Sequence, residues 1–319
     1  MTANRQGGAS CAIQSSDYGQ FWGEAVTVTV PCASNGAPDP GDFIAPAISF
    51  LQTTLAQTAW HLARGKLYLT GNRSVNLPIK PLKEIGETSP SHLKIKGRKA
   101  PCNMTVNLQG SGYPVIWHHS ARSIVKMAGQ PNARLTAKPG REDETNAIWS
   151  HAGRAHVASY LRLNTQRIAA VWSKKPMLGV NSWNTIRINA ENENVDVEAA
   201  EKALVLWLNS TFGYLLLVAH ASQPYPGRVI VPIQVLRELP VIDVRALDAD
   251  ACLAVNRLWE DLANRPLWSF AHEKNDSTRQ KIDNGLLEIL KIPANAAGDV
   301  ELLRTRLAEE TAVRGIVKK

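Results

Sequence analysis

The sequence lacks the features that mark several large classes of protein. Its 319 residues include four cysteines, which lie far apart, with no CxxC pair and no Cys/His spacing typical of zinc sites. We therefore expect ordinary reduced thiols rather than disulfides or structural zinc. The first twenty residues contain no apolar core of a signal peptide. The longest apolar stretch, 203–221, is short and interrupted by Asn, Ser, Thr and Gly, so we expect a cytoplasmic protein without a membrane span.

The common catalytic motifs are missing as well. Neither GxSxG nor GxxxxGK(S/T) occurs, which excludes the usual hydrolase and P-loop signatures. The nearest Gly-rich stretch is "LQGSGYP" (108–114). It lies between two predicted strands instead of opening a helix, so we interpret it as a hairpin turn and not as a cofactor loop.

The histidines give little support for a metal site. His118 and His119 are adjacent, and neighbouring residues of a strand point to opposite faces, so at most one of them could join a site. The acidic trio 142–144 lies in a Pro/Gly/Arg-rich stretch that predicts a solvated loop. A nuclease site built from His119 and this trio would have no fixed geometry. We expect neither a metal ion nor a cofactor.

Positive charge is concentrated in one part of the chain. The net charge is +8, and residues 91–175 contain 14 lysines and arginines against three acids, for a net charge of +11, whereas the rest carries −3. Clustered cations favour a polyanionic partner because binding releases counterions from its phosphates, although a solvated basic surface would have the same composition. The candidate DNA-binding residues are Lys94, Lys96, Arg98, Lys99, Arg122, Lys126, Arg134, Arg154, Arg167, Lys174 and Lys175.

The hydrophobic pattern predicts an α+β protein. Apolar residues at helical spacing predict a helix that ends before Gly65, and short apolar runs between Gly, Pro and Asn predict an irregular, β-rich region over 75–189. Within it, "HVASYLRLN" alternates as a half-exposed strand would. Helices return after Asp196, a predicted N-cap, and the tail 246–319 is helical in pattern. Its three apolar stripes are Leu253/Leu258/Leu262, Ile282/Leu286/Ile289 and Leu302/Leu303/Leu307.

A polar break lies inside the most apolar segment, "LWLNSTFGYLLL" (206–217). Asn, Ser and Thr cap helices because their side chains satisfy free backbone N–H groups. The break therefore predicts a junction between two buried helices, the first ending near Leu208 and the second capped by Ser210 or Thr211. A ligand-binding role for Asn209 or Ser210 is the alternative.

The order of these parts resembles the target-recognition region of adenine-N6 DNA methyltransferases of restriction-modification and phage-defence systems and, more loosely, the specificity subunits of type I restriction enzymes. A basic β-rich region leads into "SWNTIRI", then "KALVLWLNSTFGYLLL", then "VIVPIQVLRELPV". Members of the group pass from a late strand into a helix ending "-LNS-" and close with an "-L-x-x-LP-" segment before a helical tail. "LARGKLYL" and "RQKIDNGLLEIL" also match, so the resemblance covers about residues 60–292. It depends on the order of the segments and on their pattern of apolar and polar residues.

The chain departs from this family in its chemistry. It has no Pro-Pro pair, and so no "NPPY"-type motif to hold a flipped adenine, and no Gly-rich turn suited to S-adenosylmethionine. The resemblance therefore implies a sequence-recognition module without catalytic activity of its own, which binds duplex DNA and acts with a methyltransferase catalytic subunit or domain. The alternatives are a divergent DNA-modifying or DNA-cleaving enzyme with unrecognised motifs, or a fragment of a longer methyltransferase.

The expected architecture is an irregular β-rich recognition domain with a helical scaffold and a helical C-terminal tail. We expect a loop-rich segment and helix over 1–74, a DNA target-recognition-like domain over 75–245, and a helical region over 246–319.

Overall fold

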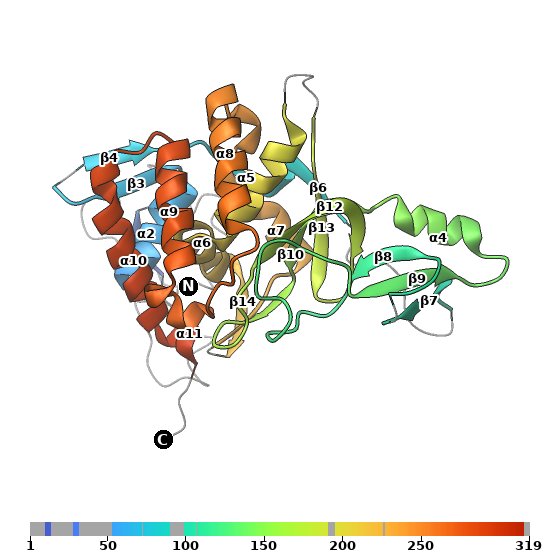
Figure 1. The fold of residues 1–319 in the computed structure, drawn as a ribbon. Coiled ribbons are helices and arrows are strands. Elements are labelled where there is room, and N and C mark those ends of the chain that lie inside the picture. Colours follow the sequence, from blue (N-terminus) through green and yellow to red (C-terminus); the bar gives the residue numbers. More distant parts are fainter. Residues whose placement is uncertain are drawn as a thin grey trace.

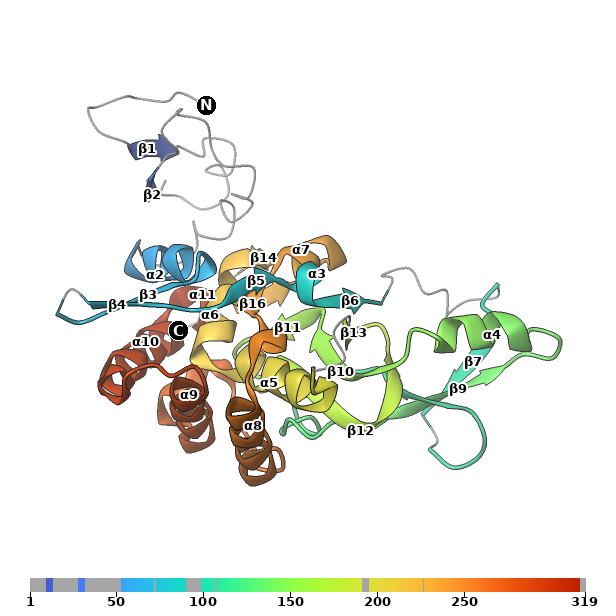
Figure 2. The same ribbon diagram turned by 90° about the horizontal axis from the view of Figure 1, so that it is seen from above.

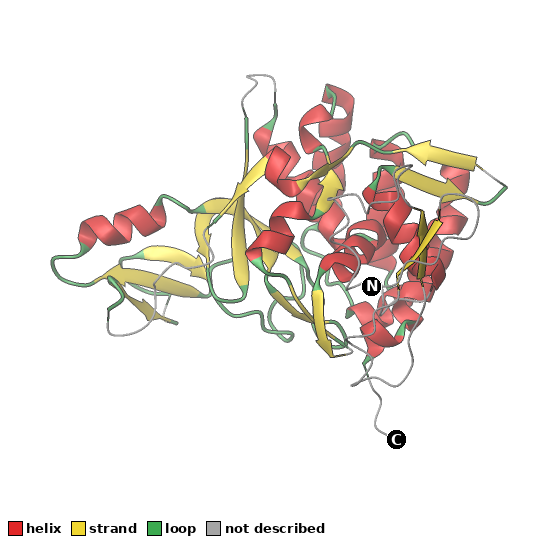
Figure 3. Ribbon diagram, turned by 180° about the vertical axis from the view of Figure 1, so that it is seen from behind, coloured by secondary structure: helices red, strands yellow, loops and turns green. Residues whose placement is uncertain are grey.

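The computed structural model describes residues 10–13, 28–31, 53–71, 73–89, 99–106, 108–190, 195–225 and 227–315. Helices gather at one end of the molecule, and strands extend from them to the other end (Figure 1). Seen from behind, the same division is clear by secondary structure (Figure 3). The predicted α+β fold with a helical C-terminal region is confirmed.

A seven-stranded sheet forms the centre of the β region. The order across it is β6 (Gly86–Thr88), β13 (Trp183–Ile188), β10 (Gly153–Ala158), β12 (Ala170–Gly179), β8 (Tyr113–Ile116), β9 (Ala133–Ala137) and β7 (Cys102–Thr105). The long strand β12 joins its two halves: its first part pairs with β10, and its last two residues pair in parallel with β8.

Two expectations for this region are wrong. The segment "HVASYLRLN" forms parts of two strands, β10 and β11 (Tyr160–Arg162), and its β10 part is not half-exposed, because residues 155–158 are all buried and helix α5 (Val197–Asn209) packs against this strand. The segment "LQGSGYP" is not a hairpin turn, since β7 and β8 both pair with β9 and therefore lie on either side of it. Neither error is visible in local sequence, because the packing of α5 on β10 and the order of β7, β8 and β9 both depend on residues distant in the chain.

Beyond β12 the sheet continues as a projecting lobe, which we define as β7, β8, β9 and α4 (Glu142–Trp149). The lobe extends away from the helices in both views (Figures 1 and 2). It has a small core of its own, in which Cys102, Val115, Ala133 and Leu135 are buried together with Leu178 of β12. This cluster is separate from the larger core that the helices share with β10 and β12.

Four smaller sheets complete the β structure of the described residues. They pair β1 (Ser10–Ile13) with β2 (Val28–Pro31), β3 (Lys66–Leu69) with β4 (Arg73–Asn76), and β5 (Ile79–Pro81) with β16 (Pro240–Ile242), and they align β11 (Tyr160–Arg162), β15 (Arg228–Ile230) and β14 (Ser222–Tyr225) in that order.

The helical end brings together helices from both halves of the chain. Its helices are α2 (Thr53–Ala63), α3 (Leu82–Ile85), α5 (Val197–Asn209), α6 (Thr211–His220), α7 (Ile233–Glu238), α8 (Ala249–Leu262), α9 (Ser277–Ile289), α10 (Ala297–Glu309) and α11 (Thr311–Arg314). The 3₁₀ turns η1 (Val244–Ala246), η2 (Phe270–Asn275) and η3 (Ala294–Ala296) connect them. The stripe predicted on α9 is buried, whereas Leu253 of α8 and Leu302 of α10 are exposed, so those two stripes were assigned too broadly.

Helices α5 and α6 meet at the polar break, as predicted. Asp196 caps α5 by accepting from the Ala199 N–H, and Ser210 caps α6 by accepting from the Gly213 N–H. The helices bend by 70° at this point. Gly213 is required there, since a Cβ at this position would lie 2.1 Å from the Trp207 carbonyl oxygen. The break therefore allows two apolar helices to turn sharply inside the core.

The three polar residues at the break are fully buried and hydrogen-bonded. The Asn209 Oδ1 accepts from the Ala169 and Ala170 N–H groups at 2.9 and 3.4 Å, and its Nδ2 donates to the Ala170 and Val205 carbonyls at 2.7 and 2.9 Å. Asn209 thus connects the end of α5 to the start of β12.

The adjoining hydroxyl ties the break to the C-terminal helices. The Thr211 N–H and Oγ1 both donate to the Asp283 carboxylate of α9, at 2.8 and 2.7 Å. Arg304 of α10 donates to the same carboxylate at 2.8 Å, and Arg279 of α9 donates to the Asn209 carbonyl. The structural interpretation of "LNST" is therefore confirmed.

Among the described residues no single helix is apolar and long enough to cross a membrane, and only the bent pair α5 and α6 meets that criterion when the two helices are taken together.

Candidate nucleic-acid interface

The predicted DNA-binding residues do not form one uniform surface. Lys94, Lys96 and Arg98 lie outside the described residues. The other eight divide into four half-buried side chains that contact the protein itself and four that are exposed.

Arg154 of β10 contacts acidic residues of α5. Its Nη1 lies 3.1 Å from the Glu198 carboxylate and its Nε lies 2.7 Å from that of Glu201. Glu201 is nearly buried, which raises its pKa, and it also accepts from the Trp172 indole N–H at 2.9 Å. The charge of Arg154 is therefore balanced inside the fold, where it fastens α5 to the sheet.

The other three half-buried cations hold loops in place. Lys126 donates to the Asn264 side chain at 3.1 Å, and Arg167 donates to the Leu267 carbonyl at 3.3 Å, so both contact the turn that follows α8. Arg134 of β9 donates to the Leu108 and Gly112 carbonyls, both at 2.7 Å, and so fixes the segment between β7 and β8.

The other four cations are exposed. Lys174 and Lys175 occupy a bulge of β12. Gly153 of β10 pairs with Met177 of β12, and Ala155 pairs with Trp172, so an advance of two residues along β10 corresponds to five along β12. The bulge places both side chains in solvent. Arg122 lies in the loop after β8, and Lys99 precedes β7. Among the described residues, the side chains of these four cations have no hydrogen-bond or ion-pair partner, so a phosphate backbone can contact them without breaking an internal interaction.

The acidic trio beside this surface forms the first turn of helix α4 rather than a loop, which corrects the prediction. Carboxylates at a helix N-terminus are favoured by the helix dipole. Glu144 also pairs with Arg141, at 2.7 Å from Nε, and this contact holds the pKa of its carboxyl below the ordinary value. Arg141 in turn donates to the Lys99 carbonyl at 2.8 Å.

Two histidines of the β region, His119 and His156, are buried and structural. His119 is buried, stacks on Trp183 and contacts the Ile168 carbonyl at 2.6 Å, and burial lowers its pKa to about 4. His156 is fully buried, which lowers its pKa to about 3. In the part of the chain that the structure describes, no group of three or more His, Cys, Asp and Glu side chains is placed to hold a metal ion.

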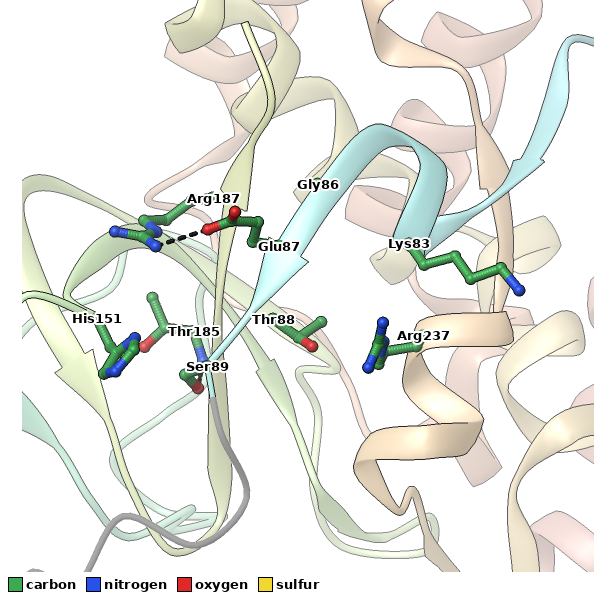
Figure 4. A pocket seen from close by; sticks show the side chains of 9 residues that line it. All are labelled: Lys83, Gly86, Glu87, Thr88, Ser89, His151, Thr185, Arg187 and Arg237. Carbon is green, nitrogen blue, oxygen red and sulfur yellow. Dashed lines mark hydrogen bonds and ion pairs between the residues drawn. The ribbon is translucent and has the colours of Figure 1, made fainter.

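A cavity of about 280 Å³ lies at the edge strand β6, away from the residues singled out by the sequence. Its lining is drawn in Figure 4 and comprises Lys83, Gly86, Glu87, Thr88, Ser89, His151, Thr185, Arg187 and Arg237. In that view, Lys83 and Arg237 lie on one side of Thr88, and Arg187 and His151 lie on the other.

Contacts among four elements, β6, β13, α3 and α7, bring the charged residues of this lining together. Strand β6 pairs with β13, which aligns Glu87 with Arg187, and helix α3 packs on α7, which brings Lys83 near Arg237. Gly86 permits the close approach of the two strands, because a Cβ there would lie 2.7 Å from the Arg187 carbonyl oxygen. Sequence reasoning missed these cations because their positions are far apart along the chain and all three lie outside the basic segment 91–175.

Comparison with known proteins finds likeness in fold alone. No family model matches the sequence, and no curated protein matches it. The fold is similar to that of the type IIG restriction endonuclease BpuSI, with 10% sequence identity and a TM-score of 0.49 over 75% of this chain. The chain spans 32% of that protein.

Proposed function

We propose that the protein is a DNA sequence-recognition module that acts with an adenine-specific DNA methyltransferase in a restriction-modification or phage-defence system. The observation that carries the proposal is the charge distribution, because residues 91–175 hold a net charge of +11 in a chain whose remainder is negative. This segment includes the projecting lobe and the bulge of β12. The proposal of an adenine-specific methyltransferase as the partner depends on the order of sequence motifs, which resembles that of methyltransferase target-recognition regions.

The proposed mechanism divides the work between two kinds of contact. Exposed cations such as Lys174 and Lys175 bind phosphates and set the affinity and orientation of the duplex. Side chains that reach base edges in a groove then select the sequence. The half-buried cations, of which Arg154 is the clearest, act indirectly by holding α5 and the loops in position.

The experiment that tests this proposal is duplex binding as a function of salt, measured by fluorescence anisotropy. Each phosphate contact contributes about 0.9 to the slope of log affinity against log salt. We expect steep salt dependence for the wild type, and a slope smaller by about 1.8 for the double variant Lys174→Ala/Lys175→Ala.

A matched control removes two exposed cations from the helical end, as Arg257→Ala/Arg306→Ala, and so changes the net charge equally. The control is expected to keep the wild-type slope. Salt-independent binding by the wild type, or equal losses in the two double variants, would contradict the proposal.

The alternative of a divergent DNA-modifying enzyme has its own test. Stoichiometric binding of S-adenosylmethionine by this chain, measured by calorimetry, would favour the enzyme, whereas a recognition module is expected to leave the cofactor unbound and to acquire methylation activity only with a partner.

A further inference from the structure

The cavity beside β6 has an unusual balance of charge. Three permanent cations, Lys83, Arg187 and Arg237, line it together with one carboxylate, Glu87. The cations come from α3, β13 and α7, so they converge only in the folded protein. Neighbouring cations repel one another, and an anion between them would reduce this repulsion further than the carboxylates paired with Lys83 and Arg187 already do.

The three cations differ in how far the protein already satisfies them. Lys83 pairs with Glu238 at 2.7 Å, and Arg187 pairs with Glu87 at 2.7 Å and donates to the Ser150 carbonyl at 2.8 Å. Arg237 is exposed, and within the described ranges its guanidinium has neither a hydrogen bond nor an ion pair. Arg237 is thus the cation with most to gain from a bound anion.

Hydroxyl groups complete the lining. Ser89 is 6% exposed, and its Oγ accepts from the Thr185 N–H at 3.0 Å, which leaves its O–H as a donor. Thr88 adds a second hydroxyl between the two groups of cations (Figure 4). Guanidinium forks combined with hydroxyl donors suit a tetrahedral oxyanion such as phosphate.

The size of the cavity limits what can enter. Pockets for drug-sized ligands measure roughly 300–1,000 Å³, and this one has about 280 Å³. It therefore has room for one phosphodiester group or a small phosphorylated molecule, and a DNA duplex could present only part of its backbone to it.

We propose that this cavity is a phosphate-binding site, with Arg237 and Arg187 as the principal contacts, Lys83 as a supporting charge, and Glu87 as an internal competitor that the phosphate displaces from Arg187. Under the proposed function, the phosphate belongs to the backbone of the recognised DNA. The site then extends the contact with DNA beyond residues 91–175, to α3, β13 and α7.

Two substitutions test the site with opposite expected signs. Arg237→Gln removes a charge-assisted contact, so affinity for the probe, inorganic pyrophosphate, should fall about tenfold. Glu87→Gln removes the competing carboxylate, so affinity should rise about fivefold. Arg257→Gln on α8 is the matched control and should leave pyrophosphate binding unchanged. Calorimetry measures all three, and thermal unfolding checks that each variant is folded.

A second arm uses the same variants with duplex DNA and distinguishes the source of the phosphate. If Arg237→Gln weakens both pyrophosphate and duplex binding, the site contacts the DNA backbone. If it weakens pyrophosphate alone, the phosphate site stands and its natural ligand is a free phosphorylated molecule, even where the duplex does not bind at all and the proposed function fails.

The phosphate site itself is overturned if Arg237→Gln leaves pyrophosphate affinity at the wild-type value, or if Glu87→Gln weakens binding. In either case duplex binding that still depends on Lys174 and Lys175 would leave the proposed function standing.

Discussion

Replacement of Asn209 by alanine should destabilise the protein more than any surface change of equal size. The amide side chain makes four hydrogen bonds of 2.7–3.4 Å, to Ala169, Ala170 and Val205, and all of its atoms are buried. Two of its partners are backbone N–H groups at the start of β12. Alanine would remove the amide oxygen that accepts from these two N–H groups, which would then stay buried with no acceptor and no access to water.

The magnitude follows from the groups left unsatisfied. A buried donor or acceptor that loses its partner costs about 1–3 kcal/mol. The Ala169 N–H and the Ala170 carbonyl are each contacted closely, so we expect a loss of about 3–5 kcal/mol once the small cavity is included. This is a large part of the roughly 5–15 kcal/mol by which most domains are stable.

The assay is urea unfolding followed by circular dichroism, with free energies compared at constant slope. Asn164→Ala, in an exposed loop, is the control and should change stability by less than about 0.5 kcal/mol. Asn209→Asp keeps the shape of the side chain but loses both Nδ2 donors, so it should also destabilise strongly. A cost below about 1 kcal/mol for Asn209→Ala, or a tolerated Asn209→Asp, would show that these hydrogen bonds do not hold α5 to β12.

Two further predictions concern the same core. Gly213→Ala should lower the free energy of unfolding by about 3 kcal/mol or more, since its Cβ would meet the Trp207 carbonyl. The control Gly298→Ala faces open space and should be neutral or stabilising in the same unfolding experiment. Equal effects of the two substitutions would contradict the packing argument. Burial raises the pKa of Glu273 from 4.5 to about 8. The folded state then holds this proton more tightly than the unfolded state, so the contribution of this carboxyl to stability is greatest below pH 4.5 and falls as the pH rises to about 8. Glu273→Gln should flatten this dependence, measured by urea unfolding at pH 5 and pH 8, and an unchanged slope would refute it.

Local sequence determined the features that depend on a few neighbouring residues. The caps at Asp196 and Ser210, the break at Asn209 and the buried stripe of α9 all follow from side chains that satisfy or cover their own helix. The concentration of positive charge in 91–175 also belongs to the sequence alone.

Only the tertiary structure decided which faces are covered and which charges remain available. The burial of β10 on both faces, and the position of β7 and β8 on either side of β9, depend on partners distant in sequence. Arg154 and Lys174 are both cations of the same basic segment. Helix α5 places carboxylates against Arg154, whereas a bulge of β12 exposes Lys174 to solvent. Whether a cation can bind an external anion depends on which groups of the protein pack against it. For Arg237, contacts among α3, β6, β13 and α7 form the cavity in which an anion could bind.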